Sequence, residues 1–595
     1  MTAPLRLLSV ELEARRGSDG SHYLRSTHPL AAPPRSVSAV LEARAAAHPD
    51  RPFLVERGPS GARTLSYGET WERAQAIGAA LLDRGADSAR PLMILSENSI
   101  DHALMTLGAM HVGVPAAPVS SAYSLASADH ARLLAVYAAL GPTLVFASSP
   151  ERYARALEAL SVVSGGALGV ISSGSNVHGA TPISALEAVR PGRAAAAAAQ
   201  GVGPETVAKV LFTSGSTGAP AGVICTQRML TSNQEMIRAA WPFLAEAPPV
   251  TLDWLPWSHT FGGNHNFFMM LWSGGTLHID DGRPAPGLIE RTVQSLSAVE
   301  PTIYFNVPRG FELLLPHIEQ DQRARQAFFR RLDLCFYAAA ALPPSTWARL
   351  ERAAELEGRA VFFTTAWGST ETAPLATSAH FLSKAPGMIG VPAPGVELRL
   401  APVEHKLEIR VRGPNVSPGY WQPGGGVAPL RLDEEGYLRT GDAVLFADSS
   451  RPEAGILFDG RIGENFKLAS GTWVSTGMVR VRLVSALAPD VSDAVITGHD
   501  RATLGALLFA VPPADDPAKQ ALLTRIRQKL AAYVEAHPSS SERVGRVLLV
   551  FEPPSLDAGE TTDKGYLNQR RVLERRAALV ERLYADSPDG EVITV

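Results

Sequence analysis

The sequence predicts an α/β protein with a large N-terminal region of mostly parallel βαβ layers, a β-rich subdomain and a small α+β C-terminal domain. Its 595 residues exceed the size at which a single hydrophobic core stops growing, so at least two domains are expected. Over roughly the first 400 residues, short apolar runs alternate with amphipathic segments, which is typical of βαβ units. Further along, strand patterns separated by Gly/Pro turns indicate the β-rich part.

The N-terminal elements follow from local signals. We expect residues 1–35 to form an irregular extension that ends at two prolines. Ser66 and Glu69 have the spacing of a capping box and predict the start of a helix, which Gly85 stops. The run PLMILSEN (91–98) predicts a strand that is followed by a helix. The alanine-rich segment 193–204 is of low complexity and is interpreted as a surface connector.

The C-terminal elements are equally periodic. KLEIRVRG (406–413) and GILFDGR (455–461) predict strands of the β-rich subdomain. ALLTRIRQKLAAYVEAH (521–537) predicts an amphipathic helix, and VGRVLLVF (544–551) predicts an apolar strand. A domain boundary is placed close to Gly460.

Composition narrows the class of protein. Hydrophobic residues make up 46% and charged residues 19%, and the net charge is −4, which argues against a disordered chain or a polybasic nucleic-acid binder. Two cysteines, Cys225 and Cys335, cannot form a disulfide framework and suit a reducing compartment. No run approaches ~18 apolar residues and no signal-peptide pattern is evident, so we expect a cytoplasmic protein with no membrane partner.

The strongest local signal is KVLFTSGSTGAPAGV (209–223). An apolar run leads there into a cluster of hydroxyl and glycine residues: Thr213, Ser214, Gly215, Ser216, Thr217 and Gly218. Backbone N–H and side-chain O–H groups of such a loop can converge on a phosphate, although an ordinary Ser/Gly-rich turn has the same composition. The loop is neither a Walker A motif, which needs Gly-Lys-Ser/Thr, nor a Gly-x-Ser-x-Gly nucleophile elbow.

This segment resembles the phosphate loop of the adenylate-forming superfamily of acyl-CoA synthetases, adenylation domains and luciferases, except that Ala221 stands where that family has a lysine. TTAWGSTET (364–372) resembles the family's aromatic-Gly-x-Thr-Glu segment. The resemblance implies that Trp367 packs on adenine, Thr370 meets the α-phosphate and Glu371 holds Mg²⁺. It also implies nucleotide contacts from Thr365, Ala366, Gly368 and Ser369.

Two further segments continue the resemblance in family order. GYLRTGDAVLF (436–446) implies that Asp442 binds the ribose hydroxyls, and FDGRIGENFKLASGTWVS (458–475) implies that Arg461 reaches the ribose-phosphate region. Gly463 falls at the family's hinge position, where a glycine can absorb a large φ/ψ change. The predicted domains are therefore an adenylation domain over 36–459, with its β-rich subdomain at about 385–459, and a mobile lid domain over 460–595.

A lysine near the C-terminus is catalytic in this family, usually within Gly-Lys-x-x-Arg. Here GETTDKGYLNQRRVLERR (559–576) has the order Lys-Gly, and a gapless match would put Tyr566 at the lysine position. We predict that Lys564 bridges the acyl carboxylate and the α-phosphate, the alternative being an ordinary solvated lysine.

The acid-binding segment is DWLPWSHTFGGNHNFF (253–268) by the same resemblance. His259 and Phe261 are predicted to line the substrate pocket, with His259 also counted as catalytic, although aromatic residues here are equally typical of a core. Ala339 and Ala340 are predicted to leave room for a flat ring. Phe466–Ser475 and the segment around Lys564 look most similar to the feruloyl-CoA synthetase branch.

The resemblance implies an ATP-dependent ligase that joins an aromatic, ferulate-type carboxylic acid to coenzyme A through an acyl-AMP intermediate, with Mg²⁺. An adenylation enzyme that loads a carrier-protein thiol, or that uses another acid, is the alternative. A weakened, non-catalytic nucleotide-binding homologue is a third possibility, because Ala221 lacks the family charge. The oligomeric state, including a homodimer, is left open.

Overall fold

The computed structural model describes residues 5–58, 61–174, 179–214, 220–285, 287–385, 387–562, 567–587 and 590–595. The chain forms two compact units. Unit 1 comprises Met1–Ala401, Arg410–Arg439 and Phe446–Leu457, and unit 2 comprises Pro402–Ile409, Thr440–Leu445 and Phe458–Val595. The domain limits expected from the sequence stay a prediction, and unit 2 differs from them in taking two short segments that precede residue 460.

A nine-stranded sheet forms one layer of unit 1. Its strands in spatial order are β22 (Gly426–Ala428), β21 (Tyr420–Gln422), β11 (Pro220–Thr226), β10 (Val207–Ser214), β6 (Ala116–Val119), β5 (Leu92–Leu95), β7 (Leu144–Ala147), β8 (Gly169–Ser172) and β9 (Thr181–Pro182). The strands from β10 to β9 run parallel, whereas β11, β21 and β22 form an antiparallel edge. The predicted mostly parallel layer is therefore present, within a mixed sheet.

A second, eleven-stranded sheet is also mixed. Its order is β1 (Leu12–Arg16), β2 (His22–Ser26), β19 (Glu397–Val403), β20 (Lys406–Arg412), β23 (Leu438–Phe446), β24 (Ile456–Arg461), β18 (Met388–Pro392), β17 (Leu375–Ser378), β16 (Phe362–Gly368), β15 (Leu334–Tyr337) and β14 (Ile303–Asn306). Strands β14, β15 and β16 are parallel neighbours. A four-stranded sheet has the order β12 (Val250–Asp253), β13 (Thr276–Ile279), β3 (Pro52–Gly58) and β4 (Gly61–Ser66).

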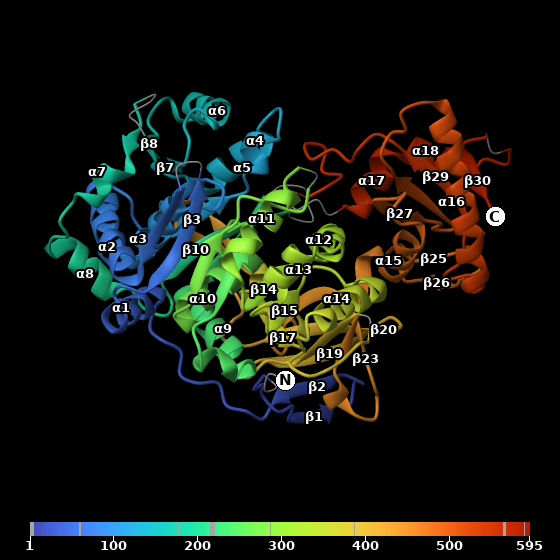
Figure 1. Ribbon diagram of the computed structural model, residues 1–595, viewed down its shortest axis with the longest axis horizontal. Helices are drawn as coiled ribbons and strands as arrows, with labels where there is room; N and C mark the ends of the chain where they lie inside the picture. Colours follow the sequence, from blue (N-terminus) through green and yellow to red (C-terminus); the bar gives the residue numbers. More distant parts are fainter. Residues whose placement is uncertain are drawn as a thin grey trace. The chain divides into compact units, whose positions relative to one another are not determined.

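Helices connect the parallel strands of unit 1 (Figure 1). Those of nine residues or more are α1 (Val37–Ala47), α2 (Tyr67–Asp83), α3 (Ile100–His111), α5 (Ala131–Leu140), α6 (Ala154–Ser164), α8 (Arg193–Gly201), α9 (Gln227–Ala240), α11 (Ile289–Val299), α12 (Pro308–Gln320) and α14 (Pro344–Leu356). The predicted capping box at the start of α2 is confirmed, because Ser66 and Glu69 exchange side-chain-to-backbone hydrogen bonds. Gly85 follows this helix with φ +80°, as expected of a helix stop.

One expectation from the sequence is wrong. Residues 5–35 are not irregular throughout, because β1 and β2 form a hairpin whose second strand pairs with β19 and buries Leu24. The segment GSDGS at 17–21 is a turn between two short strands, a signal that the sequence interpretation overlooked. The alanine-rich connector at 193–204 lies largely at the surface, as expected, and most of it forms helix α8, because alanine has the highest helix propensity of all residues.

A buried ion cluster joins strands β19 and β20 within unit 1. The Asp433 carboxylate, fully buried, lies 3.0 Å from the Arg399 guanidinium and 2.9 Å from that of Arg410. These arginines, together with backbone N–H groups of Glu435 and Tyr437, hold the pKa of the Asp433 carboxyl below its usual range despite burial.

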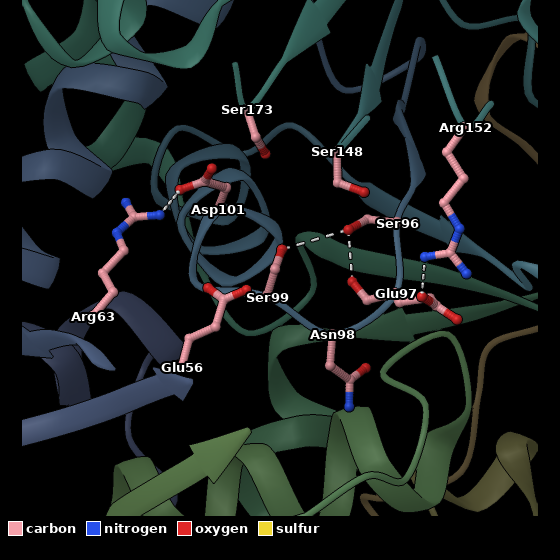
Figure 2. Close-up of a pocket in the computed structure, with 10 residues that line it drawn as sticks. All are labelled: Glu56, Arg63, Ser96, Glu97, Asn98, Ser99, Asp101, Ser148, Arg152 and Ser173. Carbon is pink, nitrogen blue, oxygen red and sulfur yellow. Dashed lines mark hydrogen bonds and ion pairs between the residues drawn. The ribbon is translucent and has the colours of Figure 1, made fainter. Parts of the chain in front are cut away.

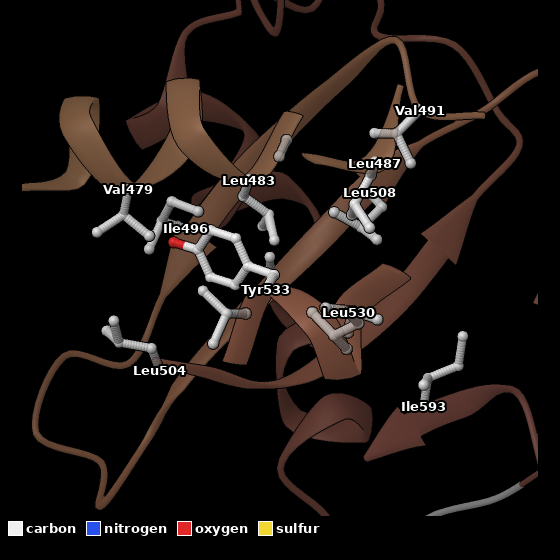
Figure 3. Close-up of a cluster of buried hydrophobic side chains, with 14 of the residues drawn as sticks. Val479, Leu483, Leu487, Val491, Ile496, Leu504, Leu508, Leu530, Tyr533 and Ile593 are labelled. Atoms are coloured by element: carbon white, nitrogen blue, oxygen red, sulfur yellow. The ribbon is translucent and has the colours of Figure 1, made fainter. Parts of the chain in front are cut away.

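Unit 2 contains a separate hydrophobic core (Figure 3). Its larger sheet has the order β27 (Asp493–Thr497), β28 (Leu504–Phe509), β29 (Val544–Val550) and β30 (Val592–Thr594), and a short pair is formed by β25 (Phe466–Lys467) and β26 (Trp473–Val474). Leu483 from α15 (Thr476–Leu487) and Leu530 from α16 (Asp516–Ala536) pack on this sheet in one buried cluster. The helix predicted at 521–537 and the strand predicted at 544–551 are confirmed.

Candidate active site

The predicted phosphate loop connects two strands of a hairpin. Strands β10 and β11 pair antiparallel, with Thr213 opposite Ala221 and Ser214 opposite Pro220. The Thr213 hydroxyl donates to the Ala221 carbonyl at 3.5 Å. Gly215, Ser216, Thr217 and Gly218 lie outside the described residues, so the convergence of their N–H groups stays a prediction. The hairpin does place both ends of the loop side by side, as a phosphate cradle requires.

Strand β16 carries the predicted nucleotide segment. Thr365 is buried and pairs with Tyr337 of β15, while Ala366 and Trp367 pair with strand β17. Trp367 is half-buried. The strand ends at Gly368, where an added Cβ atom would lie 1.6 Å from the carbonyl oxygen of Pro374. Only glycine therefore allows the chain to fold back at this position.

The turn after β16 presents Thr370 and Glu371. It forms a short 3₁₀ helix, η3 (Thr370–Thr372), in which the Ser369 N–H donates to the Thr372 hydroxyl at 2.8 Å. That hydroxyl also lies within hydrogen-bond distance, 2.6 Å, of the Pro374 carbonyl. Thr370 is buried and Glu371 is half-buried. Local backbone capping thus sets the direction of the predicted magnesium ligand.

Two buried asparagines donate hydrogen bonds to the backbone of this turn. The Asn415 side-chain amide donates to the carbonyls of Thr372 and Leu375, at 3.0 and 2.8 Å. Asn233, from helix α9, donates to the same two carbonyls at 3.4 and 2.9 Å. Because a buried carbonyl without a partner is costly, both amides stabilise the turn in one conformation. Neither asparagine was predicted, because each lies among other polar or turn-forming residues, in TSNQE (231–235) and GPNVSPG (413–419), and does not stand out in the sequence.

Tyr420 joins the hairpin to the turn. Strand β11 pairs with β21 through Val223 and Tyr420. The Tyr420 hydroxyl donates to Glu371 Oε1 at 3.2 Å, and the Glu371 carbonyl accepts from the Ser417 N–H at 2.8 Å. Burial and the neighbouring Glu371 charge raise the pKa of Tyr420 to about 12, so it remains a donor at neutral pH. The structure therefore brings the phosphate hairpin and the predicted metal ligand together, and Tyr420 is a contact that sequence reasoning missed.

The residues present fit a magnesium ion of the kind that binds with a nucleotide. Among the described residues, no group of three or more His, Cys, Asp or Glu side chains could hold a metal ion alone. Glu371 is a single carboxylate, and Mg²⁺ is usually held by one or two carboxylates together with phosphate oxygens and water. Glu371 would supply one ligand to the ion, and the phosphate oxygens of ATP would supply others.

The acid-binding segment adopts an uncommon conformation. Residues Phe261–Asn266 form a π-helix, η2. This conformation is rare in proteins overall but is often found at functional sites. An added Cβ atom at Gly263 would lie 2.3 Å from the Trp257 carbonyl oxygen, so the glycine permits close backbone approach. His259 is half-buried, and its Nδ1 accepts from the Phe261 N–H at 3.3 Å.

Phe261 belongs to a buried aromatic cluster. Its ring centroid lies 5.5 Å from that of Phe336 and 6.5 Å from that of Phe305. His265 stacks on Phe336 at 5.0 Å. By contrast, Ala339 and Ala340 are exposed after strand β15, and Ala339 has φ +75°. The pocket roles of Phe261 and the two alanines stay predictions.

His265 carries a buried nitrogen without a partner. Its Nδ1 lies 2.9 Å from Asn266 Oδ1, and the Asn266 amide donates to Asp253 Oδ2 at 2.8 Å. Because the asparagine amide is turned toward Asp253, its oxygen accepts from His265 Nδ1–H. Burial lowers the pKa of His265 to about 4, so the neutral ring keeps a lone pair on Nε2. Among the residues that the structure describes, nothing donates to that nitrogen.

The two remaining nucleotide residues lie together in unit 2. The Arg461 guanidinium is 2.9 Å from Asp442 Oδ1, and the Asp442 N–H donates to the Thr440 hydroxyl at 3.1 Å. Asp442 is buried, whereas Arg461 is exposed. Gly463 lies in the short helix η6 (Ile462–Glu464), where an added Cβ atom would meet nothing within 4 Å. Lys564 lies outside the described residues.

A polar pocket of about 260 Å³ lies elsewhere in unit 1 (Figure 2). It contains none of the predicted site residues. Ser96, Ser148 and Ser173 line it directly after strands β5, β7 and β8, at the carboxyl edge of the nine-stranded sheet. Its acidic groups are largely neutralised, because Asp101 pairs with Arg63 at 2.6 Å and Glu97 pairs with Arg152.

Across the described residues, the helices are all too short or too polar to cross a membrane.

Comparison with known proteins places the chain. A family model described as AMP-binding enzyme matches residues 41–421, and one described as AMP-binding enzyme C-terminal domain matches residues 467–588. The chain is 32% identical to anthranilate–CoA ligase of Pseudomonas aeruginosa, over 57% of this chain and 63% of that protein. It is 25% identical to carboxylic acid reductase of Mycobacterium marinum, over 89% of this chain and 47% of that protein. The chain thus covers less than two thirds of either relative.

Solved structures share the fold. An anthranilate CoA ligase in complex with anthranoyl-AMP superposes with a TM-score of 0.72 at 18% identity, over 93% of this chain and 99% of that chain. The adenylation domain of a carboxylate reductase from Mycobacterium chelonae gives 0.71 at 20% identity, over 94% and 92%. The predicted α/β fold with a large N-terminal and a smaller C-terminal domain is confirmed. Since the first family model covers more than half of the chain, the protein belongs to the AMP-binding enzyme family.

Proposed function

We propose that the protein is an AMP-forming acid–CoA ligase. The observation that carries the proposal is the junction of the phosphate hairpin with the Thr370–Glu371 turn through Tyr420. A hairpin able to cradle phosphates lies there beside an oriented carboxylate that no described cation neutralises, and a magnesium nucleotide needs both. Membership of the AMP-binding family supports the same assignment.

In the proposed first step, a carboxylate oxygen of the acid attacks the α-phosphorus of ATP, and the bond to pyrophosphate breaks. No protein nucleophile is needed, because positioning and charge neutralisation lower the barrier. Thr370 and the hairpin orient the phosphates, Glu371 holds the metal, and Lys564 neutralises charge at the reacting oxygens. A bound Mg²⁺ would offset negative charge on the phosphate oxygens.

In the proposed second step, the CoA thiolate attacks the acyl carbonyl and AMP leaves. The family resemblance implies that the C-terminal domain turns near Gly463 between the steps, so that Lys564 is withdrawn. Asp442 and Arg461 would hold the ribose and its phosphate throughout, and their ion pair within unit 2 fits a joint role.

We further propose an aromatic acid of the hydroxycinnamate type as substrate. The predicted acid segment is surrounded by flat rings, Phe261, Phe305 and Phe336. His265 Nε2 offers a buried acceptor beside them, which suits a ring carrying a hydroxyl or amino donor. The similarity to an anthranilate–CoA ligase supports an aromatic acid, although it does not favour ferulate over anthranilate.

Acid-dependent pyrophosphate release tests the first step, and CoA thioester formation tests the second. The panel is benzoic, 2-aminobenzoic, cinnamic, 4-hydroxycinnamic, ferulic and fatty acids. We expect release and thioester formation with aromatic acids that carry a donor. No release with any acid would refute the ligase. Lys564→Ala should reduce adenylation far more than thioester formation from preformed acyl-AMP, and equal losses would contradict the role of Lys564.

Loading of a carrier-protein thiol is the second candidate function. The similarity to a carboxylic acid reductase extends over 89% of this chain, further than the similarity to the CoA ligase. Replacing CoA with a phosphopantetheinylated carrier distinguishes the two. Acyl transfer to the carrier but not to CoA would favour loading, and nucleotide binding without pyrophosphate exchange would favour a non-catalytic homologue.

A further inference from the structure

Lys209 is a buried cation that pairs with no carboxylate of the described residues. It lies on strand β10, four residues before Thr213, and only 2% of its surface is exposed. Its ammonium donates to Asn264 Oδ1 at 3.0 Å and to the Gly263 carbonyl at 3.4 Å. No Asp or Glu among the described residues forms an ion pair with it. Burying an ammonium group is costly unless it is paired or hydrogen-bonded, so the two acceptors are needed to hold it.

The two acceptors both belong to the π-helix of the acid-binding segment. An added Cβ atom at Gly263 would lie 2.9 Å from the lysine Nζ, so the glycine leaves the room that the ammonium occupies. Two further hydrogen bonds fix Asn264. Its side-chain NH2 donates to the Thr260 hydroxyl at 3.2 Å, and its backbone carbonyl accepts from the Gln234 side chain at 2.8 Å. Lys209 is thus the link between this helix and the strand that leads into the phosphate hairpin.

We propose that Lys209 is a positioning residue that holds the acid-binding π-helix at a set distance from the phosphate loop. This inference rests on the proposed function, because the acid carboxylate and the α-phosphorus must meet between these two segments. A lysine with two fixed acceptors restrains both, whereas an apolar side chain would fill the space without restraining either. The effect is expected on use of the acid, with little effect on ATP binding.

The surroundings of Lys209 allow a test by pH. Burial lowers the pKa of Lys209 to about 8. The titratable groups that face it are the Cys225 thiol of β11, whose pKa burial raises to about 11, and His102 of α3, whose pKa burial lowers to about 3. Between pH 6 and pH 9, Lys209 is therefore the one member of this group expected to change charge. Its hydrogen bonds should weaken as the pH rises through about 8.

Lys209→Met is the principal variant. Methionine keeps most of the length of the side chain without its charge, and a cavity of about 10 Å³ lined by Lys209, His102 and Thr106 gives the larger sulfur some room. We expect kcat/KM for the acid to fall about 10-fold or more, with KM for ATP within about twofold of the wild type. The wild-type loss of kcat/KM above pH 8 should be absent from the variant. Thr106→Val, which lines the same cavity and keeps the shape of the side chain, is the control and should retain that loss.

Several results would overturn the proposal: equal effects on acid and ATP, an unchanged pH profile in Lys209→Met, or wild-type kinetics. Asn264→Ala and the double variant provide a readout that needs no turnover. If Lys209 acts through Asn264, the two changes in melting temperature should not add. Additive changes in melting temperature would refute the role of Lys209, whether or not the protein is a ligase. Absence of pyrophosphate release with every acid would instead refute the proposed function.

Discussion

Replacing Tyr420 with phenylalanine tests the junction on which the proposed function rests. The change removes one hydroxyl, whose hydrogen bond to Glu371 Oε1 measures 3.2 Å. A hydrogen bond to a charged group contributes about 1.5–3 kcal/mol, and the lower part of that range applies because both side chains are only half-buried. If the loss of that hydrogen bond raises the energy of the productive Glu371 orientation by about 1.5–2 kcal/mol, kcat/KM for Mg·ATP should fall about 10- to 30-fold.

The assay is acid-dependent pyrophosphate release over a range of Mg²⁺ concentrations. We expect the Tyr420→Phe variant to need more Mg²⁺ for half-maximal rate, because Glu371 is no longer held in one direction. Tyr437→Phe is a matched control, since the Tyr437 hydroxyl donates to Glu397 at 3.1 Å and its pKa is also raised to about 12. The control should lose similar stability without the change in Mg²⁺ dependence. Identical Mg²⁺ curves for the two variants would refute the reasoning.

The remaining predictions concern the turn, the predicted hinge, the ion cluster and the loop. Gly368→Ala should lower the free energy of unfolding by about 3 kcal/mol or more, because its Cβ would overlap Pro374. Gly463→Ala should change the free energy of unfolding by less than about 0.5 kcal/mol but slow thioester formation. Denaturant unfolding and single-turnover assays measure both variants. Asp433→Asn should cost about 3 kcal/mol at neutral pH, because Arg410 and Arg399 lose a buried counter-charge, while Arg399 keeps Asp19 and Glu435 as partners. The folded-state pKa of Asp433 is lowered, so its stabilisation is present above about pH 4 and should fade as the pH falls through the folded value, which unfolding curves at several pH values would reveal. Ala221→Lys should raise kcat/KM for ATP about fivefold by restoring charge beside the loop, and an unchanged value would contradict a weakened phosphate site.

Much of the fold could be predicted from local patterns. The capping box at Ser66, the apolar strand at 92–95 and the C-terminal helix each have a short-range cause, namely a side-chain cap or an apolar periodicity. The N-terminal hairpin could not be predicted in this way, because its strands alternate weakly. Leu24 is the one apolar side chain of this hairpin that is deeply buried, and that burial depends on pairing with β19, more than 370 residues away.

The candidate site divides in the same manner. Thr370 and Glu371 could be found because their residue types stand next to each other in the chain. Tyr420 could not, because its function depends on β21 pairing with β11, a contact between segments about 200 residues apart. Lys209 has an apolar strand around it, and the sequence alone cannot distinguish a lysine that is buried in a sheet from one that reaches solvent at an edge.

In unit 1, the partners of an acidic residue indicate whether it contributes to stability or is available to bind a ligand. Asp433 is fully buried and lies between two arginines, so its charge is neutralised within the protein and contributes to stability. Glu371 is half-buried, and no ion pair to it is formed by any cation of the described residues. Among the residues that the structure describes, its side chain accepts one hydrogen bond, from the neutral Tyr420 hydroxyl. A carboxylate that is oriented but not neutralised attracts a cation from outside, since the surrounding protein raises the energy of an unpaired charge. Removing Asp433 should therefore change stability first, and removing Glu371 should change Mg²⁺ dependence first.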